Sequence, residues 1–167
     1  MSHDPRQTAG LYRSEYEHDA CGVSFVVDLH GRRSHDLVAK GLTSLCNLEH
    51  RGATGAEQNT GDGAGILIQV PHDFLQRECA QLGIHLPESG EYGVGLMFAP
   101  REDEARCQAQ ALFASIVAEE QQLFLGWRDV PVNRHRIGRI SGAAMPRIRQ
   151  VFVGAATGLD QDAFERK

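Results

Sequence analysis

The sequence predicts an α+β domain, and three observations support this prediction. Apolar residues recur at every second position from Val23 to Leu29, which is the period of a half-buried β-strand. Residues 66–70 are apolar except for Gln69, and this run ends at Pro71, as is typical of a buried strand. Pro100 precedes three acidic residues and an apolar stripe at helical spacing. Strands combined with amphipathic helices indicate helices layered on sheet.

The other elements follow from local signals along the chain. Ser34 can cap a helix that carries Asp36 in its first turn and ends near Glu49. A second helix is predicted from Phe74 to Gly83, and a basic loop at residues 134–139. Further strands are predicted at residues 92–98, 123–127 and 150–154. In the helix after Pro100, the core residues are predicted to be Ala105, Ala109, Leu112, Phe113, Ile116 and Val117.

Composition limits the class of protein. With 167 residues and 41% hydrophobic content, the chain can form one sizeable core. A net charge of -5 argues against nucleic acid as a partner, since that would need a clustered basic face. Without a long apolar run or a signal peptide, the chain is expected to be cytoplasmic and not membrane-bound. No metal site is predicted, because no C-x-x-C pair occurs among Cys21, Cys46, Cys79 and Cys107.

Cys21 is the main candidate for chemistry. It stands at the start of the first predicted strand, and its small neighbours Ala20 and Gly22 leave the backbone accessible. Two interpretations are open: a reactive nucleophile, or a small buried hydrophobic residue of the kind that most cysteines are. Residues 1–20 are polar and show no period, so we interpret them as a leader or propeptide and residues 21–167 as the domain.

Two motifs in a fixed order favour the nucleophile. Residues 17–23 read Glu-His-Asp-Ala-Cys-Gly-Val, and residues 48–57 read Leu-Glu-His-Arg-Gly-Ala-Thr-Gly-Ala-Glu. With the glycine-rich run at residues 61–65, and over nearly the whole chain, the sequence resembles the glutaminase domain of glutamate synthase large subunits. Those domains are class II, N-terminal-nucleophile glutamine amidotransferases. The resemblance implies a four-layer αββα sandwich, incomplete in this chain because the helix predicted to begin at Asp160 is unfinished.

The chemistry of amide hydrolysis explains why such a cysteine would be the first residue of the mature domain. A thiol with a pKa of about 8.5 is only partly ionised at neutral pH, and a freed α-amine on the same residue can act as its base. The resemblance implies that Cys21 attacks the carboxamide of glutamine and releases ammonia. It also implies a place for Arg51 in the glutaminase pocket, although a surface charge at a helix end is the alternative. His18 and His50 are alternative bases, more simply interpreted as surface histidines.

The resemblance also carries expectations for a longer enzyme. Ammonia would travel to a synthase site in downstream domains, which use FMN and an iron–sulfur cluster to form L-glutamate from 2-oxoglutarate. Electrons would come from a small subunit of the NADPH type or from ferredoxin. The oxyanion donors and most glutamine-binding residues would lie beyond residue 167, so the isolated chain is expected to be inactive. The alternatives are another class II amidotransferase, or a fragment without activity of its own.

Overall fold

The computed structural model describes residues 22–49, 52, 57, 63–156 and 164. The chain divides into two compact units, Met1–Leu67 and Ile68–Lys167, and each is described by itself. Together the described residues combine helices with one antiparallel sheet, in agreement with the predicted α+β class. No helix among them is long and apolar enough to cross a membrane.

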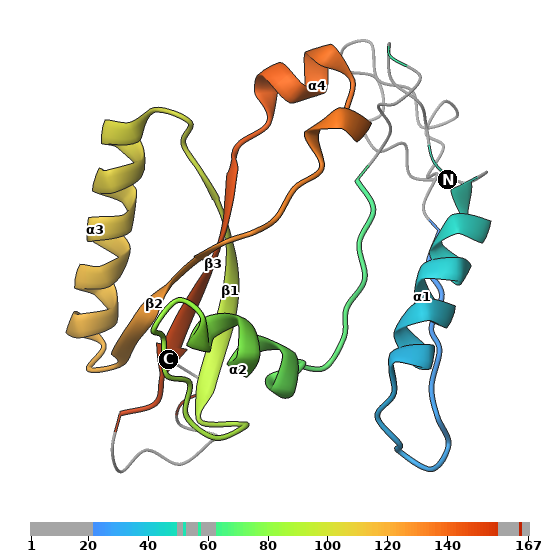
Figure 1. Ribbon diagram of the computed structural model, residues 1–167, viewed down its shortest axis with the longest axis horizontal. Helices are drawn as coiled ribbons and strands as arrows, with labels where there is room; N and C mark the ends of the chain where they lie inside the picture. Colours follow the sequence, from blue (N-terminus) through green and yellow to red (C-terminus); the bar gives the residue numbers. More distant parts are fainter. Residues whose placement is uncertain (1–21, 50–51, 53–56, 58–62, 157–163, 165–167) are drawn as a thin grey trace, which may run out of the picture. The chain divides into compact units, whose positions relative to one another are not determined.

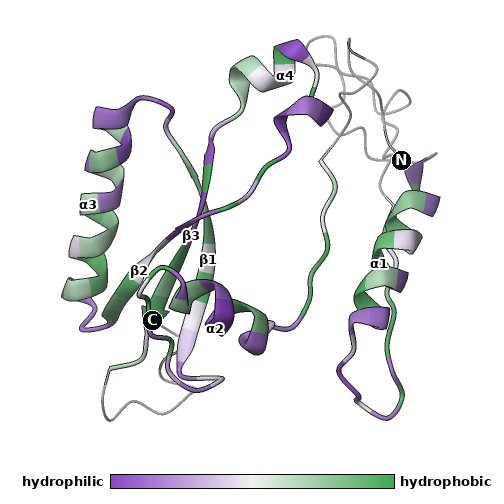
Figure 2. Ribbon diagram, in the orientation of Figure 1, coloured by the Kyte–Doolittle hydropathy of each residue, from purple (hydrophilic) through white to green (hydrophobic). Residues whose placement is uncertain are grey.

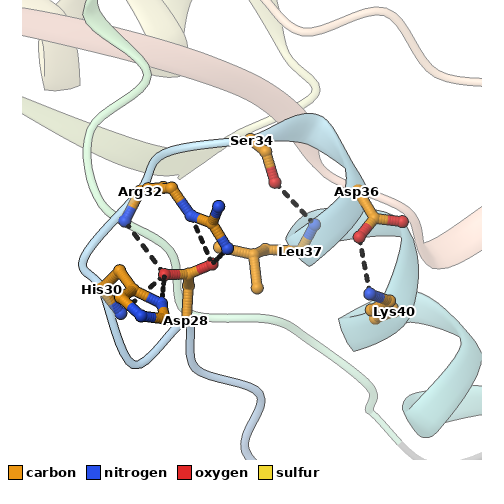
Figure 3. A network of polar contacts seen from close by, with 7 residues as sticks. All are labelled: Asp28, His30, Arg32, Ser34, Asp36, Leu37 and Lys40. Atoms are coloured by element: carbon orange, nitrogen blue, oxygen red, sulfur yellow. Dashed lines mark hydrogen bonds and ion pairs between the residues drawn. The ribbon is translucent and has the colours of Figure 1, made fainter.

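The first unit contains helix α1 (His35–Asn47), which begins where the sequence predicts. Ser34 is the N-cap, and its Oγ accepts a hydrogen bond from the Leu37 amide at 3.4 Å (Figure 3). Asp36 lies in the first turn, where its charge complements the helix dipole, and pairs with Lys40 at 2.6 Å. The predicted cap is therefore confirmed.

The two predicted strands at Val23–Leu29 and at residues 66–70 are not formed among the described residues. Both segments lie outside helices and strands, and the side chains of Phe25 and Leu67 are 90% and 102% exposed. An apolar alternation shows which face a strand could bury, but a strand exists only where a neighbour takes up its backbone hydrogen bonds. Neither segment has such a neighbour in the part of the chain that the structure describes.

The second unit is built on a three-stranded antiparallel sheet (Figure 1). Strand β3 (Arg147–Gly154) lies in the centre, between β1 (Tyr92–Ala99) and β2 (Leu123–Asp129). In register, Tyr92 of β1 and Leu123 of β2 both pair with Gly154. All three strands were predicted, and β3 begins three residues earlier than expected.

Helix α2 (His72–Ala80) covers one face of this sheet. Its Leu75 and Cys79 form the core of the unit with Tyr92 and Phe152, and the exposed fractions of these four side chains lie between 0% and 5%. Burying such side chains contributes on the order of 1.5–3 kcal/mol each. The core of the unit therefore lies between α2 and the strands β1 and β3.

Helix α3 (Asp103–Glu119) packs on β2 through its Phe113, whose ring lies 5.4 Å from that of Trp127. The predicted core stripe of this helix is only partly correct. Val117 is buried, but Leu112 and Ile116 are 62% and 48% exposed. Figure 2 shows apolar and polar residues mixed along α3, and the described strands meet only one side of it.

A β-bulge in β2 decides which residues meet which helix. Phe124 pairs with Val153 and Gly126 with the adjacent Phe152, so Leu125 is the extra residue. After the bulge the alternation is reversed, because side chains of a strand change faces at every position. Trp127 consequently faces α3, whereas Arg128 faces α2.

Gly126 at the bulge cannot easily be replaced, which gives a first prediction. Its φ is +153°, and an added Cβ would lie 2.7 Å from Cδ1 and 2.9 Å from Cγ1 of Ile84. We expect Gly126→Ala to lower the free energy of unfolding by about 1–3 kcal/mol. Urea unfolding measures this. The control is Gly142→Ala, a helical site where an added Cβ meets nothing within 4 Å, and an equal loss there would contradict the argument.

The basic stretch after β2 is not the loop that the sequence predicts. It holds a short 3₁₀ helix, η4 (Arg134–Arg136), and a helix, α4 (Arg139–Ala144). The side chain of Asn133 caps η4 by accepting a hydrogen bond from the His135 amide at 3.2 Å. The sequence prediction considered only the charges of this stretch and overlooked the helix cap formed by Asn133. The helix predicted from Asp160 lies outside the described residues, except for Phe164.

Candidate active site

The structure describes the flanks of the predicted site. Cys21 and Arg51 lie outside the described residues, as do the alternative bases His18 and His50. Their roles stay predictions. The structure describes the chain that follows Cys21, from Gly22 onward, and the helix α1 that precedes Arg51 in the sequence.

One contact links these two flanks within the first unit. The hydroxyl of Ser44, in the last turns of α1, donates a hydrogen bond to the hydroxyl of Ser24 at 2.8 Å. Ser24 lies three residues after Cys21, and Ser44 lies seven residues before Arg51. The segment that follows the predicted nucleophile is therefore held against the helix that precedes the predicted arginine.

Asp28 stabilises the turn by which the chain reverses direction between Ser24 and helix α1 (Figure 3). Its Oδ1 accepts hydrogen bonds from the amides of His30 at 2.7 Å and Arg32 at 3.3 Å, and its Oδ2 accepts from the Arg32 guanidinium at 2.9 Å. The Arg32 guanidinium first, and then these amides, lower the pKa of the Asp28 carboxyl. Gly31, with φ of +68°, completes the turn. No sequence signal weighed above pointed to the aspartate that organises this turn.

The arginine motif follows α1 directly. The helix ends at Asn47, and Leu48 caps it with its amide bonded to the Leu45 carbonyl at 3.1 Å. The amide of Gly52 then donates to the carbonyl of Glu49 at 3.0 Å, which closes a tight turn. Two described residues of the motif, Glu49 and Gly52, are thus joined by a backbone hydrogen bond just after the end of α1.

The three described cysteines differ from what a nucleophile needs. Cys79 is fully buried in the core, and burial raises the pKa of its thiol, so it stays protonated at neutral pH. Cys46 in α1 and Cys107 in α3 are exposed helix residues. In the described part of the chain, no group of three metal-ligating side chains comes together. None of these cysteines offers an environment that would displace Cys21 as the candidate.

A buried polar cluster in the second unit was missed by sequence reasoning. Arg128 is 8% exposed, and its guanidinium donates to Glu78 Oε2 at 2.5 Å and to Gln150 Oε1 at 2.9 Å. It also lies over the ring of Phe74, 5.8 Å from the centroid. Because its donors are shared among residues of α2 and β3, we assign this arginine to the packing of α2 on the sheet. Only the bulge in β2 directs it there, so no local sequence signal could have found it.

The sequence family agrees with the motifs. Residues 21–167 match the class II glutamine amidotransferases, and the chain belongs to this family. It is 45% identical to the large chain of NADPH glutamate synthase from Bacillus subtilis, over 95% of this chain. It is also 39% identical to NADH glutamate synthase from Schizosaccharomyces pombe and 36% identical to ferredoxin-dependent glutamate synthase 2 from Synechocystis, over 94% and 90% of this chain.

The matched relatives are much longer than this chain. It spans 10% of the Bacillus subtilis protein, 8% of the Schizosaccharomyces pombe protein and 10% of the Synechocystis protein. The electron donors in their names differ, being NADPH, NADH and ferredoxin. The family is therefore defined for this segment, whereas the activity and partners of a whole enzyme belong to the proposal that follows.

Proposed function

We propose that this chain is the glutaminase segment of a glutamate synthase, in which Cys21 hydrolyses L-glutamine to L-glutamate and ammonia. The observation that carries the proposal is the family match, which begins at Cys21, combined with relatives named glutamate synthases. The leader of residues 1–20 and the domain of residues 21–167 are part of the same proposal.

The reaction follows from the chemistry of a free N-terminal cysteine. The α-amine takes the thiol proton, and the thiolate attacks the carboxamide carbon of glutamine. The C–N bond then breaks, and the α-ammonium returns the proton to the departing ammonia. This leaves a γ-glutamyl thioester on Cys21. Water, deprotonated by the same amine, hydrolyses the thioester to glutamate and restores the thiol.

Arg51 supports this step as a binding residue in the proposal. A guanidinium offers several donors in a fixed plane, which suits the orientation of a substrate carboxylate or of backbone carbonyls. The link between Ser24 and Ser44 supports a common location for the two motifs, because it ties the segment after Cys21 to α1. We further propose that the described sheet belongs to an αββα sandwich completed by residues beyond this segment.

The synthase half of the proposed enzyme lies in other domains. There, ammonia from the glutaminase site would aminate 2-oxoglutarate, with electrons from an NADPH-type subunit or ferredoxin. FMN and an iron–sulfur cluster would supply the electron transfer. The described cysteines do not fit a cluster site, because they lie on three separate helices, and no step proposed here passes through either group. Localisation in the cytoplasm stays a prediction, since the relatives include a chloroplastic protein.

Covalent labelling tests the proposed nucleophile. We expect an electrophilic glutamine analogue to modify Cys21 of the mature enzyme with a stoichiometry of one, and excess L-glutamine to protect it. Peptide mass spectrometry locates the label. The exposed thiols Cys46 and Cys107 serve as internal controls for simple accessibility. Labelling of those two in preference to Cys21 would refute the assignment.

The labelling experiment, combined with an assay of glutamate synthesis from ammonia and 2-oxoglutarate, separates the alternatives. A class II amidotransferase for another product would show the same label but would not form glutamate from ammonia and 2-oxoglutarate. A segment that is inactive alone would accept the label slowly or not at all as the 167-residue chain, and readily within the longer enzyme. We expect the second pattern, because removing a single oxyanion donor lowers rates about a hundredfold or more.

A further inference from the structure

An apolar groove lies on the α3 side of the sheet, beside the edge strand β1. It has a volume of about 610 Å³ and is lined mainly by Gly93, Gly95, Met97, Phe113, Val151 and Val153. These residues share one face, because Gly93 pairs with Val153 and Gly95 with Val151. Helix α3 covers the neighbouring strand β2 and supplies Phe113 as a wall of the groove.

Two glycines give the groove its shape. At Gly95 an added Cβ would lie 3.2 Å from Cγ1 of Val151, so a side chain there would crowd the floor of the groove. At Gly93 an added Cβ would meet no atom of the sheet within 4 Å. Glycine in a strand interior weakens the strand, and one common reason for it is the close approach of another segment. Gly93 therefore marks the place where something can lie directly on the backbone of β1.

The structure places one side chain there. Cζ of Phe164 lies 4.0 Å from the Cβ position of Gly93, at ordinary van der Waals distance, and Phe164 is half-buried. The described chain after β3 continues beside the start of β1. After β3 ends at Gly154, the amide of Ala155 donates to the Glu91 carbonyl at 2.8 Å, directly before β1. Phe164 follows Gly154 by ten residues, which is enough to return along β1.

We propose that this groove is the docking site of the chain's own segment 159–167, with Phe164 as its anchor. The sequence of this segment is that of a capped helix, with Asp160 at its start and the apolar residues Leu159, Ala163 and Phe164. A helix seated there would lie beside α3 and cover the glycine face of β1. Its tether to β3 favours it over a second copy or a separate partner, because an attached segment acts at high effective concentration. The proposal is independent of the glutaminase activity.

Amide hydrogen exchange of residues 155–167, read by mass spectrometry, tests the docking. In the 167-residue chain we expect this peptide to exchange at least about tenfold more slowly than the same peptide free in solution. Phe164→Ala should remove this protection. Gly93→Leu should remove it as well, because a side chain there would take the place of the phenylalanine ring, while its Cβ would meet no other atom within 4 Å.

The control is Leu82→Ala. Leu82 is 55% exposed and follows α2, the helix on the opposite face of the sheet, and it does not line the groove, so its loss should leave the protection unchanged. Unprotected exchange in the wild-type chain, or protection that survives Gly93→Leu, would overturn the proposal. Protection that appears only at concentrations where size-exclusion chromatography shows a dimer would overturn it too, and would assign the groove to a second copy.

Discussion

Cys21→Ser is expected to abolish glutamine-dependent glutamate synthesis in the full-length enzyme while leaving ammonia-dependent synthesis largely intact. The hydroxyl of serine is a much weaker nucleophile than a thiolate, so we expect the glutamine-dependent rate to fall by about a thousandfold or more. The synthase site would still accept ammonia from solution. Parallel assays with glutamine and with ammonium salt as nitrogen source measure both rates.

Matched cysteine variants make this test specific. Cys46→Ser and Cys107→Ser change exposed thiols of α1 and α3, and we expect both activities to stay near the wild-type values. Cys79 is unsuitable as a control, because it is fully buried and its replacement would disturb the core. A parallel loss of both activities in Cys21→Ser would mean that the nucleophile or the division into two sites is wrongly assigned.

A single residue placed before Cys21 is expected to have an effect of similar size. If the α-amine of Cys21 is the base, any residue that acylates it removes that base. We compare a full-length chain that begins Met-Cys21 with one that begins Met-Gly-Cys21, after removal of the initiator methionine from both. Loss of a general base typically costs about 10²–10⁴-fold, and we expect glutamine hydrolysis to fall in this range.

Intact mass confirms the N-terminus of each preparation, and ammonia-dependent synthesis confirms that each chain is folded. For the natural enzyme the same argument predicts that residues 1–20 are absent from active material. Equal glutaminase rates in the two chains would exclude the α-amine as the base. His18 could not replace it, because both chains lack that residue, and His50 would then become the candidate.

Much of this protein is predictable from local sequence signals. The cap at Ser34 and the acidic turn after it place α1, because capping depends only on a few adjacent residues. The strands β1, β2 and β3 follow from apolar runs between turn residues. The motifs around Cys21 and Arg51 identify the family, and residues 21–167 match it. The positions of these two side chains lie outside the described residues, so their roles rest on the sequence and on the experiments proposed above.

Other features depend on contacts between distant residues. The segments 23–29 and 66–70 have the pattern of strands, yet they are not strands here, because a β-ladder requires a partner that no local pattern supplies. The bulge at Leu125 determines that Arg128 meets α2 and that Trp127 meets α3. A change of one residue in register reverses every later side chain of a strand. The sequence by itself determined the family and the locally encoded elements, whereas the tertiary structure alone decided which faces are covered, since burial depends on long-range packing.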